Sequence, residues 1–242
     1  MNQTATSTLT DTSAAVLAQR DERGVLTLTM NRPGSFNALS EEMLEALQTE
    51  LDKAAQDSGL RAVVLAAAGK AFCPGHDLKQ MVSQPELAYY QKLFAQCSRM
   101  MLTIRKLSVP VIARVQGMAT AAGCQLVAQC DLAVSVDTAR FATSGIHYGL
   151  FCATPAVPLS RNIGTKQAME MLLTGDFISA QEALARGLVN RVVPAAELDA
   201  AVESLVKSIV QKPHTAIAMG KAMFYQQAEI GIEAAYQLAG QT

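Results

Sequence analysis

The sequence has little of what usually identifies a function. Its 242 residues include no tryptophan and three histidines, and 17% of them are charged. Twenty Lys and Arg against 21 Asp and Glu give a net charge of −1 without any basic run, which argues against binding to nucleic acid. Charges, glycine and proline interrupt the apolar residues every few positions, so no segment is long enough to span a membrane. The 50% of hydrophobic residues instead predict a globular protein with a sizeable core.

The cysteines do not form a recognisable pattern either. Their number, five, is odd, and no pair has the CxxC spacing, so neither a disulfide framework nor a zinc site is favoured. Cys124 and Cys130 are six positions apart, which places them on different faces of a helix. We therefore expect all five to be small core residues in a reducing compartment. The N-terminal segment MNQTATSTLTDTSA lacks an apolar stretch and early arginines, so we expect a flexible tail over residues 1–13 and a cytoplasmic protein.

What the sequence does contain is an alternation of strand and helix patterns. Leucine and threonine alternate in Val25–Met30, which predicts a half-buried strand in a hairpin with residues 16–19. Ser40, followed by two glutamates, is a favourable cap for a helix that reaches about residue 56. The run AVVLA at residues 62–66 has no polar alternation and predicts a strand covered on both faces. Further strands are expected at residues 109–115, 132–136 and 188–193, and further helices at 86–106, 121–130, 155–161, 166–173, 179–186, 197–210 and from about 215.

This order of elements predicts an α/β fold. Strands that alternate with helices and are apolar on both faces are typical of a buried, largely parallel sheet. The second half of the chain is mostly helical, and no long linker divides it. We expect one α/β core over residues 14–194, followed by a C-terminal helical region over residues 195–242.

Two glycine-containing segments remain as candidates for a functional site. The chain has no GxGxxG after a strand and no GxxxxGK[ST], GxSxG, HExxH or EF-hand pattern. Residues 71–79 and 116–125 each leave a predicted strand and enter a predicted helix. Such a junction exposes backbone N–H groups that the helix itself does not satisfy. Two of these groups aimed at one point would stabilise a developing oxyanion, and the helix dipole would assist them.

In these segments the sequence resembles the enoyl-CoA hydratase/isomerase, or crotonase, family. The motifs that carry the resemblance are NRPGSFNALSEEM, AFCPGHDLKQM, VPVIARVQGMATAAGCQLVAQCDLAVS and TGDFISAQEALARGLVNRVV, and together they cover roughly residues 14–240. The resemblance implies a crotonase-like spiral of ββα units, a C-terminal helical trimerisation region, and homotrimers that often pair into hexamers. It also implies an acyl-CoA or enoyl-CoA substrate, with no metal and no cofactor other than the coenzyme A of that substrate.

The resemblance also implies roles for particular residues. The carbonyl oxygen of the thioester would lie between the backbone N–H groups of His76 and Ala122. This role is chemically reasonable, because enolate formation needs preorganised hydrogen-bond donors at the oxygen. Lys79 stands where family members often have a basic residue near the phosphates of coenzyme A. The other residues expected to bind substrate are Ser35, Phe36, Asn37, Gly75 and Gly123.

The sequence departs from the family where the acid/base groups are expected. Gln125 and Gly145 stand where family hydratases have glutamates. Each missing carboxylate removes a contribution of roughly 10²–10⁴-fold, so efficient hydration is not expected. His147 stands where dienoyl-CoA isomerases have a carboxylate, and Ala153 where dehalogenase-like members have a nucleophilic aspartate. The protic side chains left near the expected pocket are those of His76, Gln125, Ser144, His147 and Cys152.

The residues therefore leave two functional hypotheses open. His147 has an intrinsic pKa suited to proton transfer near pH 7, but it also fits an ordinary histidine in a former catalytic position. Gln125 either binds water or the thioester, or only preserves the shape of a glutamate. The preferred hypothesis is an acyl-CoA-binding lyase or isomerase, and the alternative is a non-catalytic acyl-CoA-binding or assembly protein. RNA binding, a third alternative, is disfavoured by the near-neutral charge.

Overall fold

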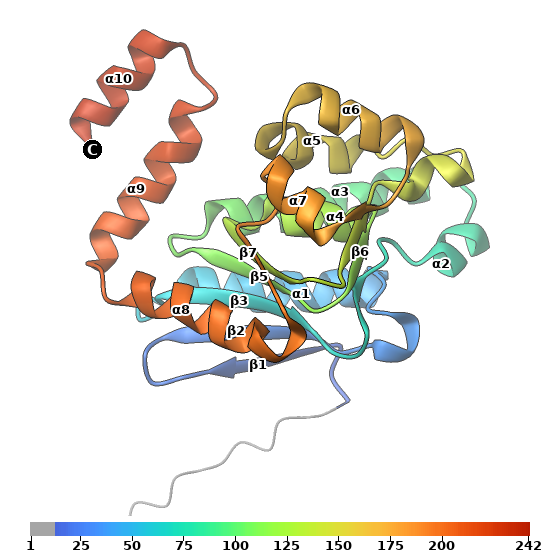
Figure 1. The fold of residues 1–242 in the computed structure, drawn as a ribbon, viewed down its shortest axis with the longest axis horizontal. Coiled ribbons are helices and arrows are strands. Elements are labelled where there is room, and N and C mark those ends of the chain that lie inside the picture. Colours follow the sequence, from blue (N-terminus) through green and yellow to red (C-terminus); the bar gives the residue numbers. More distant parts are fainter. Residues whose placement is uncertain (1–12) are drawn as a thin grey trace, which may run out of the picture.

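A computed structural model describes residues 13–242, so the tail expected over residues 1–13 lies outside the described residues except for its last position. Two sheets form the centre of the molecule, and helices cover them (Figure 1). The larger sheet has the order β1-β2-β3-β5-β7-β10, and the smaller has the order β4-β6-β8-β9. The strands of the larger sheet are β1 (Val16–Arg20), β2 (Val25–Met30), β3 (Ala62–Ala67), β5 (Val111–Val115), β7 (Leu132–Val136) and β10 (Arg191–Val193). Those of the smaller sheet are β4 (Ala71–Cys73), β6 (Met118–Thr120), β8 (Arg140–Ala142) and β9 (Ile178–Ser179).

The chain winds between these two sheets as a spiral. β3, β5 and β7 are parallel neighbours in the larger sheet, and β4, β6 and β8 follow them in the same order in the smaller one. Each turn of the spiral thus gives one strand to each sheet and then continues into helix. The helices concerned are α2 (Leu78–Ser83) with α3 (Leu87–Lys106), α4 (Ala122–Gln129), and α5 (Ala153–Asn162). The predicted α/β class and the spiral of ββα units are confirmed.

The larger sheet is held by the burial of apolar side chains on its inner face. All six residues of β3 are buried, as the absence of polar alternation predicts. On α1 (Glu41–Gln56), Leu44, Leu47 and Leu51 lie at helical spacing and are at most 2% exposed. Each such leucine contributes about 1.5–3 kcal/mol of transfer free energy. The side chain of Ser40 accepts the N–H of Met43, so the predicted helix cap is confirmed.

Short elements are where the structure differs from the prediction. The smaller sheet was not anticipated, because strands of two or three residues are too short to show alternation. The segment 71–79, expected only to connect a strand to a helix, contains β4 and the first residues of α2. The remaining helices of the second half are α6 (Thr165–Thr174), α7 (Ala180–Arg186), α8 (Leu198–Val210), α9 (His214–Gln227) and α10 (Ile232–Gln241). The last two replace the single closing helix that was expected, with Gly231 as the cap between them.

The C-terminal hairpin formed by α9 and α10 stands away from the spiral (Figure 1). Neither helix has a buried residue. α9 is attached to the spiral through Asp131, which accepts Nζ of Lys221 and the hydroxyl of Tyr225, both at 2.7 Å. Burial lowers the pKa of Lys221, and the charge of Asp131 opposes that shift. No helix in residues 13–242 combines the length and the apolar character that crossing a bilayer requires.

Candidate active site

A cavity of about 740 Å³ lies where the strands of the smaller sheet pass into helices. Its walls come mainly from the segments 34–38, 74–81, 118–122 and 144–155. Phe94 and Phe177 also line it. The sequence did not indicate these two residues, because nothing in the pattern separates them from core residues. This volume is in the range of small-molecule sites, and most of the lining is apolar with a few polar groups, as such sites require.

The two glycine-containing segments meet at the wall of this cavity. β4 ends at Cys73, and the chain continues through Gly75 to His76. β6 ends at Thr120, and only Ala121 separates it from α4. Gly75 has a φ of +101°, and a Cβ placed on it would lie 2.9 Å from Cβ of Ala121 and 3.1 Å from the nitrogen of Ala122. Only glycine permits this approach, so the sequence Pro-Gly-His brings the two segments into contact.

His76 and Ala122, whose N–H groups the resemblance implies as donors, both line the cavity beside this contact. Within residues 13–242, neither N–H donates a hydrogen bond, although Leu39 donates to the carbonyl of Gly75 at 2.8 Å. Ala122 is the first residue of α4, where the helix offers its N–H no acceptor. The chain enters α4 through Ala121, whose φ of 48° and ψ of −120° are rare for a residue with a side chain. This arrangement can hold a negatively charged oxygen.

Asp77, which follows His76, stabilises the start of α2. The carboxylate of Asp77 accepts the N–H groups of Lys79 and Gln80, at 2.9 and 3.2 Å, and so caps α2. The cap holds Lys79 at the rim of the cavity, where its side chain is exposed.

The two positions without glutamate are not equivalent in space. Gln125 is buried on α4, 4% exposed, and its Oε1 has no hydrogen-bond partner. Gly145 lines the cavity, but a Cβ placed on it would lie 2.6 Å from the carbonyl oxygen of Leu150 and 2.8 Å from Sγ of Cys152. The segment from Gly145 to Cys152 thus occupies the volume that a side chain at position 145 would need. A glutamate cannot be placed there without moving the backbone.

His147 also lines the cavity. Its ring is exposed, and Nε2 lies 3.2 Å from the carbonyl oxygen of Gly175. The sequence offered no carboxylate to orient this ring, and the structure supplies a backbone carbonyl instead. Cys152 also lines the cavity, but burial raises the pKa of its thiol. All five cysteines are buried and free, as predicted, and no metal-binding group of His, Cys, Asp or Glu occurs in the described part of the chain.

The predicted substrate-binding residues divide into two groups. Ser35, Phe36 and Lys79 line the cavity, whereas Asn37, Gly75 and Gly123 do not. Asn37 is fully buried, and its amide donates to the carbonyls of residues 68 and 71 at 2.8 and 3.0 Å. Its side chain therefore holds the loop, and the expected contact of Asn37 with substrate stays a prediction. Gly123 permits close packing, because a Cβ there would lie 2.1 Å from the carbonyl oxygen of residue 73.

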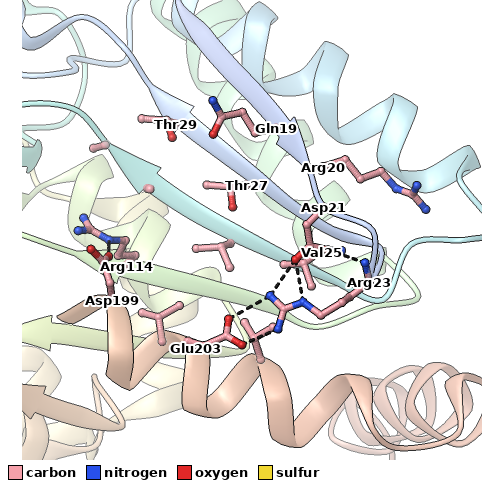
Figure 2. A pocket seen from close by; sticks show the side chains of 15 residues that line it. Gln19, Arg20, Asp21, Arg23, Val25, Thr27, Thr29, Arg114, Asp199 and Glu203 are labelled. Atoms are coloured by element: carbon pink, nitrogen blue, oxygen red, sulfur yellow. Dashed lines mark hydrogen bonds and ion pairs between the residues drawn. The ribbon is translucent and has the colours of Figure 1, made fainter. Parts of the chain in front are cut away.

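A second hollow, of about 620 Å³, lies between the outer face of β1–β3 and α8 (Figure 2). Its charged side chains are already paired. Arg23 binds Glu203 of α8 as well as its neighbour Asp21, and Arg114 binds Asp199. Arg20 pairs with Asp57 at 3.0 Å. Because every charged side chain of this wall is paired, the larger cavity is the better candidate for the active site.

The fold is a ββα spiral, and its cavity lies where two strand–helix turns meet. The sequence profile described as enoyl-CoA hydratase/isomerase matches residues 20–241. The chain belongs to this family.

Comparison with individual proteins gives the same result. Enoyl-CoA hydratase domain-containing protein 3 of Xenopus laevis, named as mitochondrial, is 42% identical over 233 residues, which is 96% of this chain and 79% of the relative. The crystal structure of an enoyl-CoA hydratase from Mycobacterium smegmatis is 61% identical with a TM-score of 0.93, covering 94% of this chain and 88% of that one. The structure of human enoyl-CoA hydratase domain-containing protein 3 is 42% identical with a TM-score of 0.90, covering 94% and 89%. The run HYGLFCATPAVPLSR indicates the same group, and the expected cytoplasmic location stays a prediction.

Proposed function

We propose that this protein binds an acyl-CoA thioester in the larger cavity and catalyses proton transfer beside the thioester carbonyl. The observation that carries the proposal is the contact between Gly75 and the start of α4 beside the cavity, where the N–H groups of His76 and Ala122 have no acceptor within residues 13–242. These groups would hold the carbonyl oxygen as negative charge develops on it. Ser35, Phe36 and Lys79 lie along the same wall and would contact the coenzyme A portion. No further cofactor is required.

Within the family's reactions, isomerisation fits the site better than hydration. Water addition needs a base for the water and an acid for the α-carbon. Gln125 offers an amide, and the space beside Gly145 is filled by Leu150 and Cys152. A proton shift needs one group that accepts and returns the proton, and histidine can do so near pH 7.

Two measurements test this proposal. Calorimetric titration with butyryl-CoA, a saturated thioester, should show binding, and incubation with crotonyl-CoA should leave the absorbance of the conjugated thioester unchanged relative to buffer. Gln125→Glu should then raise hydration by about 10²-fold, the low end for one acid/base group. Gln129→Glu, one turn further along α4, serves as the control and should not. Absence of affinity for butyryl-CoA would overturn the proposal.

The second candidate function is acyl-CoA binding without catalysis. The loss of both carboxylates favours it, since the two backbone donors would remain without a proton-transfer pair. Butyryl-CoA binding combined with no exchange of its α-protons would identify this function.

We also propose that the protein forms homotrimers, or hexamers made from two trimers. Exposed apolar side chains gather on the C-terminal hairpin, which contributes nothing buried to its own chain. They include Met219, Phe224, Ile230, Ile232 and Tyr236. Covering them by a second copy would remove this apolar surface from water.

A further inference from the structure

Two hydroxyl groups on one wall of the larger cavity have no role in the function proposed so far. Ser144 begins the short helical turn Ser144–Tyr148, and Thr154 is the second residue of α5. Both residues line the cavity and are half-buried. Within residues 13–242 neither hydroxyl makes a hydrogen bond, and neither is enclosed by protein. Both hydroxyls are therefore accessible to a molecule in the cavity.

The threonines nearby differ from these two residues. Thr120 lines the same cavity, but its hydroxyl donates to the carbonyl of Pro74 at 2.8 Å. Thr143, which precedes Ser144, donates to the carbonyl of Met171 at 2.7 Å. The fold thus satisfies the hydroxyls of Thr120 and Thr143 and leaves those of the cavity wall for a ligand. An alkyl chain packed there would displace water without replacing its hydrogen bonds, which lowers affinity.

The start of α5 adds a further donor to this wall. The first three residues of the helix all line the cavity. The N–H of Ala153 is bound to the carbonyl of Phe151 at 2.7 Å, and Pro155 has no N–H. The N–H of Thr154 donates to no acceptor in the part of the chain that the structure describes. Because the helix dipole is positive at this end, an anion is favoured beside the two hydroxyls.

The charges around the cavity agree with this preference. Residues 144–155 contain no aspartate or glutamate that would repel an anion. Asp77 lines the cavity from the segment 74–81, and its carboxylate is bound by the N–H groups of Lys79 and Gln80. Among the oxygen groups that an acyl chain can carry, a carboxylate accepts the most hydrogen bonds and forms the strongest ones. It is therefore the best match for two hydroxyls and one N–H.

We infer that the wall formed by Ser144 and the start of α5 binds a carboxylate on the acyl group, so that the substrate is the coenzyme A thioester of a dicarboxylic acid. This inference rests on the proposed function, in which His76 and Ala122 hold the thioester oxygen. The four residues line one cavity of about 740 Å³, so a single acyl group can contact both places. The inference names the substrate class and adds no chemical step.

The test compares affinities by calorimetry on the full-length protein. At least one of malonyl-, succinyl- and glutaryl-CoA should bind about tenfold or more tightly than butyryl-CoA, as expected for hydrogen bonds to a charged group. Thr154→Val keeps nearly the same shape and removes one hydroxyl. It should weaken binding of the preferred dicarboxylic thioester by about tenfold and that of butyryl-CoA by less than about threefold. Ser144→Asp, which places a like charge on the wall, should abolish the preference and serves as the second variant.

A serine on the same helix provides the matched control. The hydroxyl of Ser160 in α5 donates to the carbonyl of Val157 at 3.3 Å, and the residue does not line the cavity. Ser160→Ala should leave every affinity unchanged. A ligand control replaces the carboxylate of the preferred thioester by a methyl ketone and should bind about tenfold less tightly.

The outcomes separate the inference from the function on which it rests. Equal affinity for butyryl-CoA and all three dicarboxylic thioesters would overturn the inference and leave acyl-CoA binding standing. A preference that survives both Thr154→Val and Ser144→Asp would overturn it too, as would equal binding of the methyl ketone. If the two variants weaken free coenzyme A as strongly as the dicarboxylic thioester, the wall binds the phosphates and the inference is wrong. Absence of affinity for every thioester would overturn the proposed function itself.

Discussion

The spiral and the C-terminal hairpin are held in place by different interactions. In the spiral, whole strands are buried, and glycines such as Gly123 allow backbone segments to touch. In the hairpin no residue is fully buried, and α9 is fixed by the partly buried polar contacts of Lys221 and Tyr225 with Asp131. The difference indicates that the spiral folds around its own core, whereas the apolar residues of the hairpin are available for a second copy.

The largest expected effect comes from adding one methyl group in the spiral. In Gly123→Ala the new Cβ would lie 2.1 Å from the carbonyl oxygen of Cys73, so backbone must move. We expect a loss of more than about 4 kcal/mol in the free energy of unfolding, measured by urea denaturation. The control is Gly220→Ala in α9, where a Cβ meets nothing within 4 Å. It should stabilise α9 by about 0.5–1 kcal/mol, and equal effects at the two glycines would contradict the comparison.

The next effect concerns the attachment of α9. Lys221→Met leaves the carboxylate of Asp131, which is 14% exposed, without its cation, and this should cost about 3 kcal/mol. Hydrogen exchange should show the loss concentrated in α9 and α10, with the strands of the larger sheet still protected. Arg23→Met removes an exposed ion pair with Glu203 and should cost less than about 1 kcal/mol. If both substitutions have the same cost, the polar contact at Asp131 does not hold the hairpin.

A smaller effect should appear in how the stability of the spiral depends on pH. Because the pKa of His76 is below 6.5 in the folded protein, the unfolded chain binds more protons between the two pKa values. The contribution of His76 to stability is therefore complete above pH 6.5 and falls as pH decreases through that window. Thermal melts at about pH 7.5 and about pH 5.5 should show a smaller shift for His76→Gln than for the wild-type protein. An unchanged shift would mean that the ring is not buried in solution.

The smallest effect on the folded monomer should come from the hairpin surface. Ile232→Ser and Tyr236→Ser change side chains that are 74% and 75% exposed, so unfolding free energy should change by less than about 0.5 kcal/mol. The mass in solution, measured by light scattering, should nevertheless fall from a trimer or hexamer toward a monomer. An unchanged mass would show that these residues do not form the interface.

Elements with a long, uniform pattern could be predicted from the sequence, and short ones could not. The leucines of α1 and the apolar run of β3 each specify one structure, and both are confirmed. Three-residue strands such as β4 depend on pairing with β6, which is a tertiary contact and leaves no local pattern. The break between α9 and α10 at Gly231 was missed because the helical pattern continues on both sides of it.

The candidate site shows the same division. The places of His76 and Ala122 in the fold could be predicted from motifs, because a turn from a strand through glycine into a helix is local in the sequence. The sequence could not predict that the space beside Gly145 is filled, because this depends on how the chain folds back at Leu150 and Cys152. The role of Asn37 depends likewise on carbonyl groups more than 30 residues away.

The two groups that we propose to bind the thioester oxygen, at His76 and Ala122, are main-chain atoms, and this has a consequence for how the site can vary. A point mutation can replace any side chain in the cavity, but it cannot delete a peptide N–H unless it introduces proline. In the proposed function, recognition of a thioester is thereby separated from the chemistry that follows it. Substitutions at positions such as Gln125 and Gly145 would alter the reaction, whereas the proposed capture of the carbonyl would depend only on the path of the backbone.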